Sequence, residues 1–255
     1  MTPSFSAIAI ETSNPSACPA EVGVGAIGSE AAFVERLSPA RRHDDDLMPA
    51  IDRLCGRAGV RPGDLRAVVV SVGPGGYTGL RIAVTTARFI AEATGAACIG
   101  VPTAEVAACA ASRDGRPFAV ALASKGEHAF VTPFDAQGSP TAAGRVLDAE
   151  GVGALGLPRL IGDGFLPESI RRMASASGIS VEPIVLGASW LLRAAAGRES
   201  VDPSRLVPMY AREPEAVRLW RARGGGRGVI GPWENGGEPL PCGRGLQVVG
   251  RWHGS

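Results

Sequence analysis

Short apolar runs alternate with polar or glycine-rich breaks along the first half of the chain. The runs are four to seven residues long, the usual length of a β-strand. We expect strands at residues 6–10, 22–27, 31–37, 67–72 and 98–101. The run at 67–72 reads AVVVSV, which is typical of a strand buried on both faces.

Between these runs, apolar residues recur every three or four positions, which is the spacing of one helix face. One such stripe follows the carboxylates at 44–46, which suit the electropositive start of a helix, and Gly59 can end that helix. Further helices are expected at 78–94 and 104–111. Strands alternating with helices predict an α/β fold, a largely buried sheet flanked by helices.

The second half of the chain begins with another pair of apolar runs, Phe118–Ala123 and Ala129–Phe134, which predict an antiparallel hairpin. A strand ends near residues 160–164, and helices are expected at 167–177 and 188–196, followed by an extended piece at 206–211. Each half therefore starts with a strand and a hairpin. This echo suggests a duplicated domain.

Composition excludes several classes of protein. The chain has 255 residues, a net charge of +1 and 45% hydrophobic residues, which argues against wholesale disorder and against strong nonspecific binding of polyanions. Only Lys125 among the 26 basic residues is lysine; this arginine bias suits phosphate recognition but equally a GC-rich genome. The five cysteines form no C-x-x-C pair, and we expect a cytoplasmic protein without signal peptide or membrane span.

A glycine-rich turn, G-P-G-G-Y-T-G at 73–79, lies between an expected strand and an expected helix. It lacks the Gly-Lys-Ser/Thr of a P-loop, and Thr78 occupies the third glycine position of the dinucleotide fingerprint. Two interpretations stay open: a nest of N–H groups that holds an anion or nucleotide, and a tight turn that packs the helix against the sheet. The candidate anion-binding residues are Gly73, Gly75, Gly76, Thr78, Gly79 and Arg81.

Candidate catalytic groups are few. The three histidines are scattered without an H-E-x-x-H pattern, and no G-x-S-x-G elbow is present. Glu11 and Asp163 each lie at the end of an expected strand, where a carboxylate can hold metal or phosphate or simply cap the strand. We predict no catalytic residue and no metal site.

The expected helix at 78–94 has an unusually narrow polar face. Arg81, Arg88 and Glu92 are its only charged residues and share one stripe, and the rest is apolar or small. Two apolar sides indicate either a helix enclosed within its own domain or one that also meets a partner subunit.

Five segments together resemble the bacterial TsaB (YeaZ) family. Residues 73–82, GPGGYTGLRI, resemble its signature G-P-G-S-F-T-G-[LV]-R-I, with Gly76-Tyr77 in place of Ser-Phe. Four further segments resemble family motifs in the same order: Glu11-Thr12-Ser13, Arg42-His43 with 47–49, 99–103 and 208–212. The segment at 122–129, LASKGEHA, lacks the family's Asp and Tyr.

The resemblance implies the two-lobed fold of actin, Hsp70 and sugar kinases (the ASKHA fold), with duplicated mixed sheets flanked by helices. We accordingly expect a first lobe at 1–103 and a second at 104–221. Residues 222–255, rich in Gly and Pro, are expected to form a flexible tail.

The resemblance also implies a role in placing threonylcarbamoyl on the adenosine next to the tRNA anticodon. In that family TsaB is a non-catalytic subunit that pairs with its paralogue, the transferase TsaD, and an ATPase, TsaE, joins them. We therefore expect tRNA to bind through the complex. We also expect ATP to be bound mainly by partners, and no cofactor on this chain. An ATP-binding phosphotransferase or metalloprotease-like enzyme of the same fold is the alternative, and a homodimer is an alternative assembly for the isolated chain.

In the family, the two N-lobe helices form the subunit interface. Carried over to this sequence, the expected interface residues are the apolar positions of the helices at 46–58 and 78–94, namely Leu47, Met48, Ile51, Leu54, Leu80, Ala83, Val84, Ala87 and Ala91.

Overall fold

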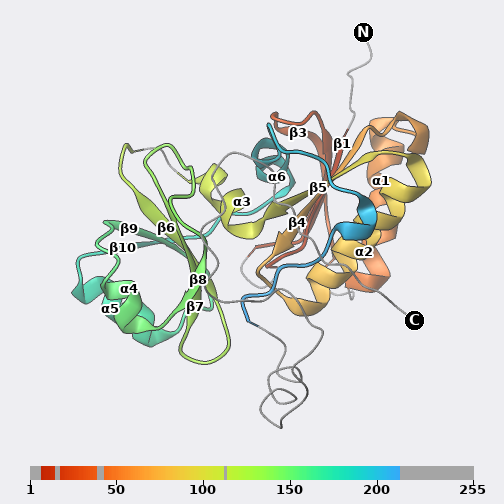
Figure 1. Ribbon diagram of the computed structural model, residues 1–255. Helices are drawn as coiled ribbons and strands as arrows, with labels where there is room; N and C mark the ends of the chain where they lie inside the picture. Colours follow the sequence, from red (N-terminus) through yellow and green to blue (C-terminus); the bar gives the residue numbers. More distant parts are fainter. Residues whose placement is uncertain (1–6, 15–17, 39–42, 112–113, 213–255) are drawn as a thin grey trace, which may run out of the picture.

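The computed structural model describes residues 7–14, 18–38, 43–111 and 114–212. Two β-sheets lie side by side with helices between them and on their outer faces (Figure 1). The expected flexible tail at 222–255 lies outside the described residues.

The first sheet has five strands in the order β3-β2-β1-β4-β5. Strands β3, β2 and β1 form an antiparallel meander, and β1, β4 and β5 are parallel to one another. The strand bounds are β1 Ala7–Glu11, β2 Glu21–Gly25, β3 Ala31–Arg36, β4 Ala67–Gly73 and β5 Ala97–Pro102.

The second sheet repeats this arrangement. Its order is β10-β9-β6-β7-β8, with β6 antiparallel to β7 and parallel to β9, as β1 is to β2 and β4. The bounds are β6 Phe118–Ala123, β7 Ala129–Phe134, β8 Arg145–Leu147, β9 Arg159–Gly162 and β10 Ser180–Pro183. The matching strand orders confirm the duplication that the two hairpin starts suggested.

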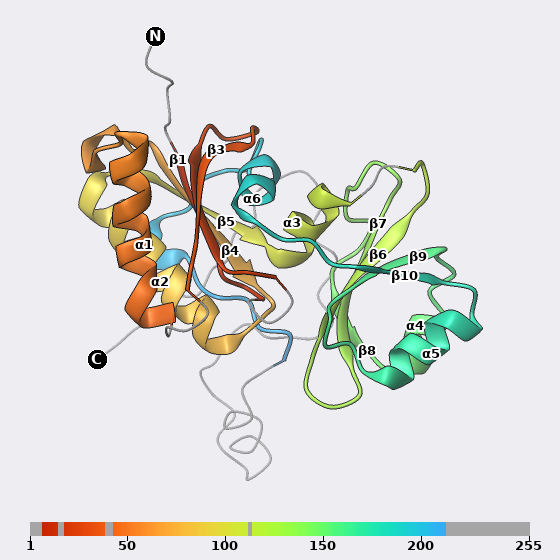
Figure 2. The same cartoon turned by 180° about the vertical axis from the view of Figure 1, so that it is seen from behind.

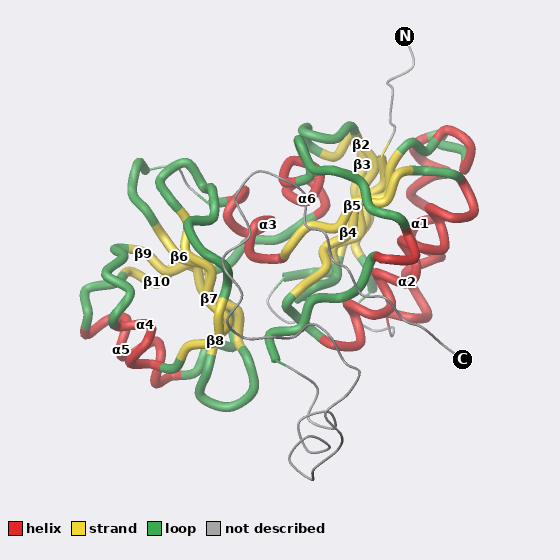
Figure 3. Tube along the Cα trace, viewed as in Figure 1, coloured by secondary structure: helices red, strands yellow, loops and turns green. Residues whose placement is uncertain are grey.

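Helices complete five layers, which Figure 2 shows from behind and Figure 3 by type of element. One pair, α1 and α2, covers the outer face of the first sheet, and another, α4 and α5, covers the outer face of the second. The remaining pair, α3 and α6, lies between the sheets. The helix bounds are α1 His43–Ala58, α2 Tyr77–Thr94, α3 Thr103–Ala110, α4 Ala149–Gly153, α5 Glu168–Ala176 and α6 Ala188–Ala194, with short 3-10 turns η1 Pro62–Asp64 and η2 Pro203–Arg205.

The central layer holds one core that both sheets share. Val69 from the first sheet and Phe118 from the second belong to the same buried cluster, together with Leu191 from α6. Each large apolar side chain buried in this way contributes about 2 kcal/mol to stability. The two sheets are therefore joined by packed helices as well as by the chain.

After the second sheet, the last described part of the chain returns to the first sheet. Helix α6 packs on β1 and β2, and Val201 forms a bridge with Cys98 of β5. The Met209 N–H then donates to the Val72 carbonyl at 2.7 Å. Residues 188–209 thus contribute to the layers around the first sheet, and the domain boundary expected at residue 103 stays a prediction.

Candidate functional site at the junction of the two sheets

A buried polar segment follows β1 where the two sheets face each other. Glu11, Thr12 and Ser13 are each at most 2% exposed, and Asn14 is 9% exposed. The backbone N–H and hydroxyl of Ser13 both donate to Glu11 Oε1, whereas Glu11 Oε2 has no hydrogen-bond partner within the described part of the chain. Burial raises the pKa of Glu11 to about 7, although the bonds from Ser13 oppose the rise.

Asp163, which follows β9, meets this segment from the second sheet. Its Oδ2 accepts from Asn14 Nδ2 at 2.7 Å and from the Ala123 N–H at 3.2 Å, and its Oδ1 accepts from the Phe165 N–H at 2.8 Å. Both oxygens of this buried carboxylate are thus engaged by the protein itself. Sequence placed Glu11 and Asp163 at strand ends, and the structure brings both to the same junction.

The glycine-rich turn packs against this segment. A Cβ atom on Gly75 would lie 2.0 Å from the Ser13 carbonyl oxygen, and one on Gly79 would lie 2.8 Å from the Thr12 oxygen. The Gly76 N–H donates to the Ser13 oxygen at 2.6 Å, and Thr12 Oγ1 donates to the Gly79 oxygen. These contacts explain the glycines as positions where two backbones approach closely.

Gly73 serves a similar purpose on the other side of the turn. Its φ is +107°, and a Cβ there would lie 2.4 Å from the Met209 oxygen. Thr78 and Arg81, by contrast, are exposed at the start of α2. The role of the turn in binding an anion or nucleotide stays a prediction.

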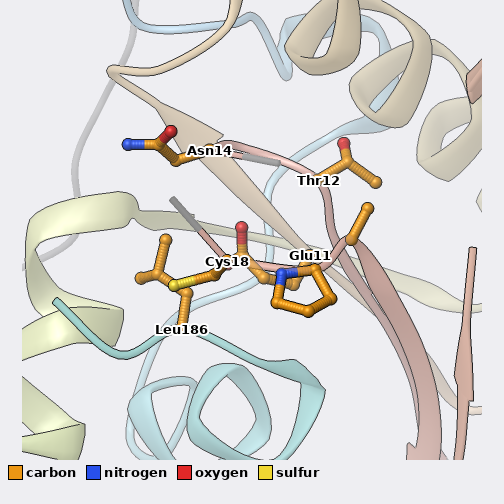
Figure 4. Close-up of a pocket in the computed structure, with 7 residues that line it drawn as sticks. Glu11, Thr12, Asn14, Cys18 and Leu186 are labelled. Carbon is orange, nitrogen blue, oxygen red and sulfur yellow. The ribbon is translucent and has the colours of Figure 1, made fainter. Parts of the chain in front are cut away.

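A small hollow adjoins Glu11, but it is too narrow to admit a water molecule. Figure 4 shows Cys18 and Leu186 close together beside Glu11, while Asn14 and Thr12 lie along the loop after β1. The Cys18 thiol donates to the Ile184 carbonyl, and burial raises its pKa. The sequence did not single out Cys18 or Leu186, because their contacts join segments more than 160 residues apart.

A larger hollow of about 280 Å³ lies at the ends of β9 and β10. Arg171 lines it and donates to the carbonyls of Asp163, Gly164 and Leu166, so its guanidinium is held in place. Glu182, also in the lining, pairs with Arg159. Within the described residues there is no group of three His, Cys, Asp or Glu side chains that could hold a metal ion.

The expected partner-interface residues are core residues in the structure, with one exception. Met48 is 46% exposed, but the other eight are at most 7% exposed. All of these except Leu80 belong to the core cluster that the helices share with the first sheet. The buried eight are Leu47, Ile51, Leu54, Leu80, Ala83, Val84, Ala87 and Ala91. One apolar side of α2 packs on β4 and the other meets α1 and η2, which accounts for its narrow polar face.

The outer surface of the same helices carries different apolar side chains. Phe89 on α2 is 64% exposed, and Tyr77 at the start of α2 is 54% exposed. Binding of a partner by α1 and α2 stays a prediction, and Met48 and Phe89 are among the exposed side chains available for it. Among the described residues, no helix is both long enough and apolar enough to span a bilayer.

The duplicated sheets and the layered helices define the class of protein: the two-lobed ASKHA fold expected from the sequence. The family model for tRNA N6-adenosine threonylcarbamoyltransferase, TsaD, matches residues 37–192, more than half of the chain. Among curated proteins, the tRNA threonylcarbamoyladenosine biosynthesis protein TsaB of Bacillus subtilis (strain 168) is 34% identical over 85 residues. That match spans 33% of this chain and 35% of the relative.

Solved structures agree on the fold. A protein with similarity to the peptidase YEAZ from Pseudomonas aeruginosa has a TM-score of 0.65 at 22% identity, covering 82% of this chain and all of that one. YeaZ from Pseudomonas aeruginosa has a TM-score of 0.64 at 21% identity, covering 81% of this chain and 99% of that one. The chain belongs to the TsaD-type family. It is similar to a TsaB protein over a third of its length, and it shares its fold with YeaZ.

Proposed function

We propose that this chain is a non-catalytic subunit of the complex that makes threonylcarbamoyladenosine in tRNA, where it supports a TsaD-like transferase. The observation that carries this proposal is that the two buried carboxyl groups at the junction between the sheets have no room for a ligand. Both carboxylate oxygens of Asp163 accept hydrogen bonds from protein donors, and the Glu11 carboxyl lies beside a hollow too narrow for water. Neither carboxyl group is placed to act on a bound substrate.

A scaffold needs an exposed surface for its partner. The outer surface of α1 and α2 provides exposed apolar side chains, Met48 and Phe89, on helices that rest on a continuous core. Large apolar side chains left in water on a rigid element are typical of protein contact sites. We assign the transferase contact to this surface, and the same surface would serve a homodimer of the isolated chain.

The remaining parts of the proposal concern ATP and tRNA. We propose that a TsaE-like ATPase and the transferase bind the ATP that the complex uses, so this chain needs no cofactor of its own. The tRNA reaches this chain through the complex, and the whole assembly works in the cytoplasm.

Reconstitution tests the proposal directly. Threonylcarbamoyl transfer to tRNA is measured with the TsaD-like and TsaE-like partners, with and without this chain. We expect modification to fall to background without the chain and to return when it is added. Undiminished modification in its absence would contradict the proposal.

Titration with ATP and magnesium separates the proposal from the alternative of a phosphotransferase. Calorimetry on the isolated chain should show no saturable heat. Tight ATP binding would favour the phosphotransferase if a folded Gly75→Val variant loses it. Metal analysis tests the other alternative, because stoichiometric zinc in the purified protein would favour the metalloprotease-like enzyme.

A further inference from the structure

Two tyrosines and an arginine from distant segments meet on the surface at the start of α2. The rings of Tyr77 and Tyr210 have centroids 5.1 Å apart, with an angle of 30° between their planes. The Arg81 guanidinium lies 5.3 Å from the centre of the Tyr77 ring, and Arg81 Nη1 donates to the Tyr77 hydroxyl at 3.1 Å. We call these three residues the Tyr–Arg cluster.

The cluster is exposed to solvent, but hydrogen bonds of Arg81 and of the segment next to Tyr210 fix its position. Tyr77 is 54% exposed and Arg81 is also exposed, so neither side chain is part of the core. Arg81 forms no ion pair with a carboxylate in the described part of the chain, and its contacts there are with Tyr77. Tyr210 comes from the last described segment, which the bond from Met209 to Val72 anchors on β4. An ordered aromatic and guanidinium surface therefore faces solvent.

The surroundings of the cluster suit a nucleic acid better than an apolar partner. The exposed neighbours of Tyr77 along the turn and α2 are Gly75, Gly76 and Thr78, none of which adds apolar surface. Arg205 and Arg212 are exposed on the segment that carries Tyr210. Asp202 interacts electrostatically with Arg205 and Arg88. Between residues 201 and 212, the last described segment, two arginines stand against this one acidic residue, although the whole chain is close to neutral.

Stacking on tyrosine and on a guanidinium plane is the usual way in which proteins hold unpaired bases. We propose that the Tyr–Arg cluster binds an unpaired base of RNA, with the base stacked on Tyr77 and Arg81 and the neighbouring phosphates near Arg205 and Arg212. The identification of the RNA as tRNA rests on the proposed function, whereas the stacking itself rests on the cluster. The cluster would then give this subunit a direct contact with the substrate of the complex.

Binding of a labelled RNA hairpin with unpaired adenosines in its loop tests the proposal, measured by fluorescence anisotropy with the full chain and with its complex with the transferase. We expect Tyr77→Leu and Arg81→Gln each to weaken binding about tenfold, the effect of losing one stacked base. Tyr77→Phe should retain most of the affinity, because the ring remains. Duplex RNA of the same length should bind more weakly, and the variants should change its affinity little.

Phe165→Leu is the matched control, since Phe165 is an aromatic residue that is 59% exposed and follows β9 of the second sheet, outside the Tyr–Arg cluster and outside the proposed transferase surface. It should leave RNA binding unchanged. Wild-type affinity of Tyr77→Leu for the hairpin would overturn the proposal, and so would loss of transferase binding in Tyr77→Leu without loss of RNA binding. Omission of the chain is then compared with Tyr77→Leu in the modification reaction. If omission abolishes modification but Tyr77→Leu leaves the KM for tRNA unchanged, the scaffold function is supported and the proposal that the Tyr–Arg cluster binds RNA is wrong.

Discussion

Asn14 and Asp163 are 149 positions apart in the sequence, and a buried hydrogen bond of 2.7 Å joins them. Asn14 follows β1 of the first sheet, and Asp163 follows β9 of the second. The bond therefore ties the two sheets together at the place where they face each other. Because Asp163 also holds the N–H groups of Ala123 and Phe165, the tie is built on the ends of two strands of the second sheet.

Removing the amide of Asn14 should loosen this tie. We expect Asn14→Ala to lower the free energy of unfolding by about 2 kcal/mol, because a buried carboxylate loses a charge-assisted hydrogen bond. Asp163→Ala should cost more, since it leaves three donors without an acceptor. Urea denaturation of each variant measures both values.

The double variant separates the tie from the other roles of Asp163. If the two side chains act through their shared bond, Asn14→Ala should cost clearly less when Asp163 is already alanine. Additive losses would show that the bond contributes little.

The raised pKa of Glu11 makes a prediction about pH. The carboxyl has a pKa of about 7 in the folded chain and an ordinary value of 4.5, so the folded state favours the protonated form. Its contribution to stability is full below pH 4.5 and is lost as the pH rises to about 7. Over that interval, the wild type should lose on the order of 3 kcal/mol relative to Glu11→Gln. Thermal or urea unfolding at a series of pH values gives this difference.

The comparison uses the change with pH because glutamine alters the site equally at every pH. Its amide brings donors to a position where Oε2 has no hydrogen-bond partner among the described residues. Glu168→Gln, the same change on an exposed side chain of α5, serves as the control and should leave the pH profile of the wild type in place. A Glu11→Gln profile parallel to that of the wild type would contradict the assignment.

Two glycines should respond in opposite directions to the same substitution. Gly75→Ala places a Cβ atom 2.0 Å from the backbone oxygen of Ser13, so we expect a loss of about 3 kcal/mol in stability. Gly56 lies inside α1 with no atom within 4 Å of an added Cβ, so Gly56→Ala should gain roughly 0.5 to 1 kcal/mol. A neutral result for Gly75→Ala would mean that the turn can move away from Ser13.

The partner surface can be tested without disturbing the core. Phe89→Glu and Met48→Glu place charges on exposed positions of α2 and α1, so the chain should fold and binding of the transferase should fall at least tenfold. Ala83→Glu should instead prevent folding, because Ala83 is fully buried and an unpaired charge there costs several kcal/mol.

Val185→Glu provides the control for this test, since Val185 is 48% exposed but belongs to the loop after β10. It should leave the complex intact in size-exclusion chromatography. An intact complex with Phe89→Glu and Met48→Glu would place the interface elsewhere.

Much of the fold could be predicted from the sequence because its long elements have strong patterns. The apolar run at 67–72 became β4, and the expected helix at 78–94 became α2 with one residue added at its start. Three elements were missed: β8, α4 and β10, which have three, five and four residues. The helix among them contains fewer than two turns, and the strands contain at most two repeats of the strand pattern, so periodicity carries little information about these segments.

The sites were harder to predict than the fold. Glu11 and Asp163 could be chosen because a carboxylate at the end of a strand can hold metal or phosphate or cap the strand, but their neighbours depend on how the two sheets meet. The interface residues were chosen because they are apolar, and most apolar positions of these helices are buried in the core. Ala83 and Ala87 are buried, whereas Phe89, which was not chosen, is exposed to solvent. The width of the apolar face of a helix indicates how much of its surface is buried. It does not indicate whether the residues that pack on it belong to the same chain or to a partner.

The position of α6 has a consequence for synthesis of the protein. The inner face of the first sheet is covered by a helix that begins at residue 188, after the whole second sheet. A nascent chain that has only reached β5 therefore holds a sheet with one bare apolar face. The first lobe cannot reach its final stability on the ribosome until the second has been translated, so the duplicated halves, although alike in topology, should mature together.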